Sequence, residues 1–418
     1  MKPRKDIYEL DKRLVSMKEA IKNSAIPEKN KELILSFEKV CALENLSKAR
    51  RTRIMQLLRL FCEKYLVGKE FDKVNKDDLK DAILNLESDN LSPWTIHTYK
   101  AVLKKFFKWL YYGDNYKDKF GYPEIISWLK CSIKPQEKPK VKASEILTEE
   151  EIDKLIKAAE HPRDKAFISM LYELGARISE IGNLKIKDIT RDEYGYLVDL
   201  SGKTGHRTPR IIESDPYLTT WLNTHPNRED GEAPLWVITV GKNKGKKMNY
   251  SSFRALIRRL ARKAGIKKRI YPHLFRHTRV THLLLKKQIN EAQAKVYFGW
   301  TPSSKMLAEY AHLVSRDVND VMLQIHGIKT DKKEEKPRIK QCPRCKKING
   351  KDDLFCRYCG SPLDVKTAIR LDEKRNTADE MMLKLLKELL SEKEIKTLIA
   401  RKIVEGKLGK LQREYFVD

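Results

Sequence analysis

A tyrosine near the end of one short stretch is the first residue whose setting invites chemistry. The stretch GWTPSSKMLAEYAH places Tyr310 ten residues after Trp300. A tyrosine hydroxyl has a pKa near ~10 and is mostly protonated at neutral pH. To attack a phosphodiester it needs cations on the non-bridging oxygens, a group that takes its proton, and an acid for the leaving oxygen. Arginine suits the first task, because its planar fork matches a phosphate and keeps its charge.

Two other stretches carry arginines and a histidine at suitable spacings. In GARISEIGNLKIKDI, Gly175 is expected to end one helix, so that Arg177 starts the next with Glu180 in reach to orient its guanidinium. In PHLFRHTRVTHLLLK, His273 and Arg276 are three residues apart and share one helical face. There one side chain can clamp a phosphate while the other moves protons. An exposed Arg-Glu helix pair is the alternative reading of the first stretch.

The remaining candidates are expected to play smaller parts. Lys203 lies at the tip of a predicted hairpin, where a lysine is either solvated or placed to act as a general acid. His277 and His282 are expected to pack or to form hydrogen bonds. Tyr297 is the rival to Tyr310 nearby, and it is expected to belong to the core.

Taken in order, these stretches resemble the tyrosine recombinase (phage-type integrase) family. The resemblance rests on Arg177 in GARISEIGNLKIKDI, Lys203 in SGKTGHRTPRI, the HLFRH motif and the GW…Y pair, and it covers about residues 31 to 326. It implies a site-specific recombinase that cleaves and rejoins DNA through a 3′-phosphotyrosine intermediate, without metal or ATP, to integrate or excise a mobile element. A type IB topoisomerase-like enzyme and a catalytically silent DNA-binding protein on the same fold remain alternatives.

The resemblance also implies roles for individual residues. Arg177 and Arg276 would clamp the scissile phosphate while His273 assists proton transfer. Lys203 would protonate the 5′ oxygen as it leaves, and Tyr310 would attack and stay joined to the 3′ phosphate.

The sequence departs from the family pattern near the tyrosine. Trp300 stands where many members have histidine, and its indole N–H can donate to a phosphate oxygen but cannot shuttle a proton. The spacing from Trp300 to Tyr310 is one residue longer than the commonest form, and Phe275 takes a position usually given to leucine. The longer spacing leaves open whether Tyr310 serves its own active site or that of a neighbouring protomer.

The balance of charge indicates a polyanionic partner. The 418 residues include 86 Lys and Arg against 58 Asp and Glu, a net charge of +28. Such a field favours nucleic acid through release of phosphate counterions, with an acidic membrane surface or ribosomal RNA as alternatives. Candidate DNA contacts lie on helices with cationic sides: Arg50, Arg51, Arg53, Lys100, Lys104, Arg258, Arg259 and Arg262. Double-stranded DNA and three further copies of the chain, as a homo-tetramer on DNA, are the expected partners, and the free protein is expected to be a monomer or dimer.

Helical periodicity, caps and linkers predict a mainly α protein with a small β-hairpin or sheet. Ser47, Asn75 and Ser92 are expected to cap helices, and Thr148 with Glu151 has the spacing of a capping box. The predicted segments are an N-terminal charged helix or arm (1–30), a helical core-binding domain (31–118), a linker (119–146), a mixed α/β catalytic domain (147–328), a linker (329–340), a zinc ribbon (341–364) and C-terminal helices (365–418).

Four of the seven cysteines form a cluster. Cys342 and Cys345 precede Cys356 and Cys359 by ten intervening residues, and two such CxxC pairs are typical of one structural zinc ion. So short a segment cannot build a hydrophobic core, so a metal would have to hold it. Because thiolates would fill all four positions, catalysis at zinc, as in a nuclease, is not expected, and a redox dithiol is the alternative. The appended ribbon resembles those of archaeal virus and plasmid integrases.

The chain shows no apolar run long enough to span a membrane and no signal peptide at Met1. We therefore expect a cytoplasmic, nucleoid-associated protein.

Overall fold

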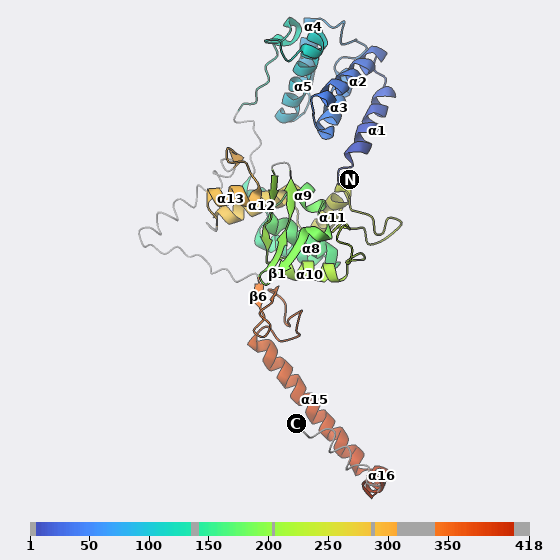
Figure 1. The fold of residues 1–418 in the computed structure, drawn as a ribbon, viewed down its shortest axis with the longest axis vertical. Helices are drawn as coiled ribbons and strands as arrows, with labels where there is room; N and C mark the ends of the chain where they lie inside the picture. The colour runs from blue at the N-terminus through green and yellow to red at the C-terminus, as the bar shows by residue number, and fades with distance from the viewer. Residues whose placement is uncertain (1–5, 135–141, 203–204, 286–288, 307–338, 405–418) are drawn as a thin grey trace, which may run out of the picture.

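The computed structural model describes residues 6–134, 142–202, 205–285, 289–306 and 339–404 (Figure 1). Along its long axis lie an N-terminal helical bundle, a central domain of helices with small sheets, and a C-terminal part made of a cysteine-rich ribbon and a long helix. This mainly α architecture with a small β component confirms the predicted fold class.

The N-terminal bundle consists of α1 (Leu10–Lys22), α2 (Glu28–Leu43), α3 (Lys48–Lys64), α4 (Lys76–Ser88), α5 (Pro93–Tyr112) and α6 (Glu124–Ser127). Three of these helices begin at the predicted caps. The side chains of Ser47, Asn75 and Ser92 accept hydrogen bonds from main-chain N–H groups in the first turns of α3, α4 and α5. Each cap satisfies a donor that a helix start leaves open.

The hydrophobic core of the bundle extends beyond the predicted segment 31–118. Ile21 and Ile26 come before that segment, Ile126 and Leu129 come after it, and all four are buried in the same cluster. The outer face of α1 is highly charged, which hides its apolar spacing, and α6 is a single turn, too short to show a helical period.

Residues 6–9 precede the bundle but pack on the central domain. Ile7 is 2% exposed and belongs to the central hydrophobic core, where it lies against Gly182. Its carbonyl accepts a hydrogen bond from the Tyr250 N–H at 2.9 Å, and its N–H donates to Asn183 Oδ1 at 3.2 Å. The bundle is therefore tied to the central domain at its N-terminal end as well as through the chain that leaves it.

The central domain contains seven α-helices among its described residues: α7 (Glu149–Ala158), α8 (Pro162–Leu174), α9 (Ile178–Gly182), α10 (Asp215–Asn223), α11 (Tyr250–Lys263), α12 (Pro272–Leu285) and α13 (Glu291–Phe298). Helix α8 is buried along most of its length and forms the centre of the core. Helix α7 starts with the predicted capping box of Thr148 and Glu151. In α11, the predicted inward residues Phe253, Ile257 and Leu260 are buried.

Five short strands complete the central domain: β1 (Ile189–Asp192), β2 (Gly195–Val198), β3 (Leu200–Gly202), β4 (Gly205–Arg207) and β5 (Arg210–Ile211). Strands β1, β2 and β5 form one antiparallel sheet in that order, while β3 pairs with β4 in a separate hairpin. The hairpin confirms the predicted pair of apolar runs. Strand β1 was not predicted, because most of its residues are exposed and give no alternating pattern. Short 3-10 turns lie at Gly113–Asn115, Ala143–Glu145 and Ile186–Asp188.

The C-terminal part begins with the hairpin of β6 (Ile339–Gln341) and β7 (Ile348–Gly350) and continues with α15 (Val365–Ser391) and α16 (Lys393–Val404). Helix α15 runs away from the central domain (Figure 1), and its apolar stripe, which includes Met382 and Leu386, is exposed. Among the helices that the structure describes, none combines the length and apolarity needed to cross a bilayer.

Candidate active site and cysteine centre

Arg177 is placed by a helix break. Helix α8 ends at Gly175, whose φ of 50° is left-handed and whose absent Cβ makes room for Phe298, since a Cβ there would lie 2.7 Å from that ring. Arg177 then occupies the N-cap of α9, as predicted. Its guanidinium donates to Glu180 Oε1 at 2.9 Å, and its main-chain N–H donates to Glu180 Oε2 at 3.0 Å. The carboxylate thus fixes both the side chain and the start of the helix.

Arg276 lies on α12 and is 2% exposed. Its guanidinium donates to the Gly175 carbonyl at 3.0 Å and to the Phe298 carbonyl at 2.7 Å. It also lies 5.3 Å from the centre of the Phe298 ring and 5.4 Å from that of Trp300. Trp300 itself is buried at 8% exposure. The two carbonyls and the two rings hold the guanidinium beside the main chain that leads to Arg177.

His273 is one helical turn before Arg276 and reaches the surface of the domain. Partial desolvation, followed by the charges of Arg276 and Arg177, lowers the pKa of His273 below its usual value. Both arginines therefore lie near enough to act electrostatically on the same imidazole, and the bond from Arg276 to the Gly175 carbonyl brings α12 beside the segment that leads to Arg177. A neutral imidazole at neutral pH can accept a proton.

The two predicted packing histidines lie beside this group. The His277 ring is 4.5 Å from the His273 ring in an edge-to-face contact, and burial, with the neighbouring charges, lowers the pKa of His277 to about 4. His282 Nδ1 forms a hydrogen bond of 2.9 Å with the Tyr172 hydroxyl. Both residues therefore pack or form hydrogen bonds, as the sequence predicts.

Two predicted site residues, Lys203 and Tyr310, lie outside the described residues. Gly202 and Gly205, the partners that flank Lys203 in the hairpin, are paired across β3 and β4. The rival tyrosine, Tyr297, donates its hydroxyl to the Glu173 carbonyl at 2.8 Å, and burial raises its pKa to about 12. Tyr297 is therefore engaged in packing, as predicted.

Sequence reasoning missed Arg207 on β4. Its guanidinium donates to Glu180 Oε2 at 2.8 Å, so Glu180 holds two arginines. The signal available in the sequence was an arginine four residues after Lys203, on the returning strand of a predicted hairpin.

The predicted DNA contacts have varied surroundings. Arg50, Arg258 and Arg262 are exposed. Arg259 is also exposed, although it pairs with Asp164. The other four have protein partners: Arg51 pairs with Glu38, Arg53 with Gln56 and Lys100 with Glu87, while Lys104 donates to the Leu129 carbonyl.

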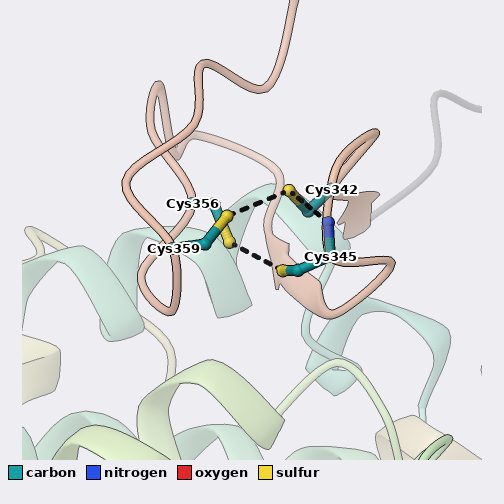
Figure 2. Close-up of side chains that lie close together, drawn as sticks. All are labelled: Cys342, Cys345, Cys356 and Cys359. Carbon is teal, nitrogen blue, oxygen red and sulfur yellow. Dashed lines mark hydrogen bonds between the residues drawn. The ribbon is translucent and has the colours of Figure 1, made fainter. Parts of the chain in front are cut away.

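The four clustered cysteines meet at one point of the ribbon (Figure 2). Their Sγ atoms all lie within 4.8 Å of one another, with Cys342 and Cys359 at 3.6 Å and Cys345 and Cys356 at 3.5 Å. A tetrahedron of Zn–S bonds near 2.3 Å would require sulfurs about 3.8 Å apart.

Main-chain turns support this arrangement of sulfurs. Each CxxC pair is followed by a residue with left-handed φ, Lys346 at 59° and Gly360 at 72°. Cys342 Sγ accepts the Cys345 N–H at 3.5 Å. The four sulfurs are therefore close enough together to bind one metal ion, and four thiolates suit zinc.

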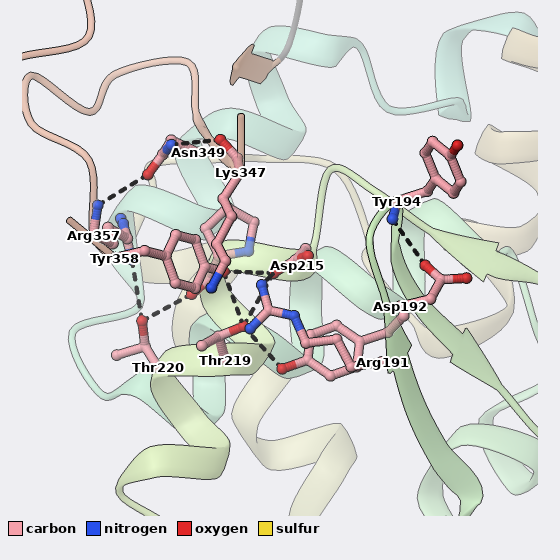
Figure 3. Close-up of polar contacts among 12 residues, drawn as sticks. Arg191, Asp192, Tyr194, Asp215, Thr219, Thr220, Lys347, Asn349, Arg357 and Tyr358 are labelled. Carbon is pink, nitrogen blue, oxygen red and sulfur yellow. Dashed lines mark hydrogen bonds and ion pairs between the residues drawn. The ribbon is translucent and has the colours of Figure 1, made fainter. Parts of the chain in front are cut away.

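The ribbon packs on α10 of the central domain (Figure 3). The Tyr358 hydroxyl donates to Asp215 Oδ1 at 2.8 Å, and Asp215 is only 2% exposed. Arg191 and Lys347 lie near the Tyr358 ring, at 4.7 and 4.9 Å from its centre. Burial, followed by Asp215, raises the pKa of Tyr358 to about 12.

A second set of contacts joins the ribbon to the same surface. Arg357 donates to Thr220 Oγ1 at 3.2 Å, and Lys351 forms an ion pair with Asp153 on α7. The cysteine centre is therefore fixed to the central domain by polar contacts on two helices.

Two arginines whose charges both act on one histidine form a group suited to binding a phosphate ester. Residues 145–316 match the family described as the phage integrase family. Tyrosine recombinase XerA of Pyrococcus furiosus is 30% identical over 255 residues, which cover 60% of this chain and 80% of that protein. The XerA of Pyrococcus horikoshii is 26% identical over 259 residues, with 61% and 80% covered. The chain belongs to the phage integrase family of tyrosine recombinases, and it is an enzyme that breaks and rejoins DNA strands in site-specific recombination.

The fold agrees with this assignment. A solved structure of a lambda integrase dimer bound to a COC′ core site aligns with a TM-score of 0.50 at 14% identity, over 73% of this chain and 80% of that one. At that identity the likeness concerns the fold alone.

Proposed function

We propose that this recombinase integrates or excises a mobile element, of the kind carried by archaeal viruses or plasmids, through a covalent intermediate on Tyr310. The observation that carries the proposal is the grouping of Arg177, Arg276 and His273: Arg276 bonds the Gly175 carbonyl two residues before Arg177, and the charges of both arginines act on His273. The match of residues 145–316 to the family includes all of these positions.

The chemistry follows from the named atoms. Arg177 and Arg276 hold the non-bridging oxygens of the scissile phosphate and neutralise the charge that develops there. The Tyr310 oxygen attacks phosphorus and its proton passes to His273, which is neutral and able to accept it. The bond from phosphorus to the 5′ oxygen breaks, and Lys203 donates a proton to that oxygen.

Rejoining reverses these steps. The phosphotyrosine ester keeps the energy of the broken bond, so a 5′ hydroxyl from a second strand can attack it without ATP. Trp300, buried against Arg276, contributes an indole N–H as a donor to a phosphate oxygen and shapes the arginine's surroundings. Its inability to shuttle a proton leaves that role with His273.

The cysteine cluster serves a structural role in this proposal. One zinc ion bound by Cys342, Cys345, Cys356 and Cys359 would hold the ribbon in the form that contacts α10. Four thiolates complete a tetrahedral site, so no ligand position remains for a reacting group. The catalytic steps above use no metal.

Duplex DNA is the proposed partner, and four copies of the chain are proposed to act on two sites. The net charge of +28 and the exposed Arg50, Arg258 and Arg262 support a polyanionic partner. The solved lambda integrase complex with a core site is a related precedent for DNA binding by this fold.

The test is a covalent trap. The full chain is incubated with a pool of nicked duplexes of randomised core sequence, designed so that the 5′ fragment diffuses away after cleavage. A denaturant-resistant protein–DNA adduct should form with the wild type and not with Tyr310→Phe, and sequencing the trapped DNA gives the site. Two plasmids carrying that site should then be joined.

Each other outcome supports a different reading. An adduct with plasmid relaxation but no joining would indicate a nicking-closing enzyme of the topoisomerase type. Binding without any adduct would indicate a silent DNA-binding protein. An adduct that persists in Tyr310→Phe would refute the assignment of the nucleophile.

A further inference from the structure

One buried arginine contacts three segments of the active site, and the mechanism above gives it no task. Arg207 ends β4, directly opposite Leu200 of β3, and its side chain is only 10% exposed. In the sequence, Lys203 directly follows the last residue of β3. An arginine this far buried needs partners for its charge and its donors.

The guanidinium of Arg207 finds those partners on separate parts of the chain. One nitrogen donates to Glu180 Oε2 at 2.8 Å, and Nε donates to the Tyr297 carbonyl at 3.0 Å. Its third nitrogen lies against Gly299, where an added Cβ would come within 2.8 Å. Gly299 directly precedes Trp300, so Arg207 joins the hairpin to the segment that packs against Arg276.

Glu180 is the second half of this junction. Its side chain is 1% exposed, and it accepts hydrogen bonds from Arg177 as well as from Arg207. Burial raises the pKa of Glu180, but the bonds and charge of Arg207, followed by those of Arg177, hold it below the usual value. The lowered pKa keeps the carboxylate ionised at neutral pH, and Arg207 is the first of the two arginines that lower it.

The hairpin also approaches Glu180 very closely. A Cβ added to Gly202, the residue before Lys203, would lie 2.4 Å from Glu180 Oε1. The absence of a Cβ at Gly202 therefore lets the base of the hairpin lie against the carboxylate that holds Arg177.

We propose that Arg207 is a positioning residue for strand cleavage, which acts through Glu180 and the main chain at Tyr297 and Gly299 to hold Arg177, the hairpin and Trp300 in one arrangement. The proposal rests on the function proposed above, because it assumes that Arg177 clamps the phosphate. Arg207 does not contact the DNA in this role. Its fork matters as much as its charge, since lysine is a point charge that cannot reproduce several fixed donors.

The first measurement compares cleavage with binding. Adduct formation by Arg207→Gln in single turnover, on the nicked duplex pool, should fall on the order of 100-fold, the effect that a small misplacement of a clamping group can have. Affinity for the same pool should change less than about threefold, because Arg207 does not contact the DNA in this role. A residue that contacted a phosphate would instead, when replaced, weaken binding and reduce the salt dependence of binding. Arg207→Lys should recover part of the rate.

The second measurement is the pH profile of cleavage. Without Arg207 the buried Glu180 should have a higher pKa and take up a proton at a pH where the wild-type carboxylate is still ionised. Cleavage by Arg207→Gln should therefore decline at a higher pH than wild-type cleavage as the solution is acidified. A purely structural role would lower the rate without moving this limb.

Arg210→Gln is the matched control. Arg210 lies on β5 and forms two short bonds to Asp192, a partially exposed carboxylate away from Glu180. Its loss should leave rate and pH profile at the wild-type values, and thermal unfolding of each variant checks that it is folded at the assay temperature.

The proposal is overturned if Arg207→Gln cleaves like wild type, if its affinity falls as far as its rate, or if its acid limb coincides with that of the wild type. If Arg207→Gln is unfolded, the same three criteria apply to Arg207→Lys. A wild type that forms no Tyr310-dependent adduct refutes the proposed function itself, and this inference with it.

Discussion

The contact between the ribbon and α10 yields a prediction with a calculable size. In Tyr358→Phe the ring stays near Arg191 and Lys347, but the hydroxyl that donates to Asp215 is lost. A hydrogen bond to a charged group contributes about 1.5–3 kcal/mol. Asp215 keeps Thr219 and Arg191 as partners, but it is too buried for water to replace the lost donor. Docking of the ribbon should therefore weaken by about 2 kcal/mol, or about 30-fold in its equilibrium constant.

Amide hydrogen exchange followed by mass spectrometry measures this directly. Exchange in β7 (Ile348–Gly350), which contacts α10, should quicken by about 30-fold if local opening of the docked ribbon limits it. The variant should keep its metal, since no cysteine is changed. Tyr194→Phe removes the hydroxyl of an exposed tyrosine in the turn between β1 and β2, whose ring points away from Tyr358 (Figure 3), and it should change nothing.

A double-mutant cycle isolates the pair. In an Asp215→Asn background, Tyr358→Phe should add much less than it does alone, because the charged acceptor is already gone. Exchange of β7 within about twofold of the wild type, with metal retained, would show that other contacts hold the ribbon and would refute the reasoning.

Three further predictions concern the hairpin, the metal and pH. Gly202→Ala places a Cβ 2.4 Å from Glu180 Oε1, so adduct formation should drop on the order of 10- to 100-fold. The control is Gly231→Ala, whose new Cβ meets only Lys187 at 3.4 Å, and it should cleave at the wild-type rate. A fully active Gly202→Ala would contradict the close approach of the hairpin to Glu180. Metal analysis should find one zinc ion per chain. Removal of the zinc with a chelator, or the substitution Cys356→Ser, should abolish the protection of the β6 and β7 amides from hydrogen exchange. Amides that stay protected after zinc is lost would refute a structural role for the metal. Burial holds the pKa of His277 at about 4 in the folded state, against about 6.5 in the unfolded chain. The free energy of unfolding should therefore fall by about 3 kcal/mol as the pH drops from 6.5 towards 4. The thermal midpoint of His277→Gln should fall less than that of the wild type over this range, and equal falls would contradict the assignment.

The elements that could be predicted are those whose signals are local. Caps at Ser47, Asn75 and Ser92 confirmed the helix starts, because each depends on a side chain and the next turn only. The placement of Arg177 after Gly175 was predictable for the same reason, since a left-handed glycine ends a helix whatever surrounds it.

What escaped prediction depends on contacts between distant segments. Arg207 resembles any strand arginine until Glu180 and Tyr297 are brought beside it. The hydrogen bond from Tyr358 to Asp215 joins residues 143 positions apart, and the local sequence around either residue does not predict the contact. The predicted DNA contacts have the same limit, because the sequence shows the charge of Arg51 but not the buried Glu38 that pairs with it.

The burial of Ile7 bears on how this polypeptide acquires its fold. Its amide is bonded to the side chain of Asn183, 176 positions further along. During synthesis residues 6–9 must therefore wait until well over a hundred more residues have emerged before they find their site. The helical bundle can form before this happens, because its core is made of residues close to one another in the sequence. The bundle is therefore inserted between Ile7 and the rest of the central domain. Closing so long a loop is entropically costly and slow, so the N-terminal residues should be among the last to become ordered.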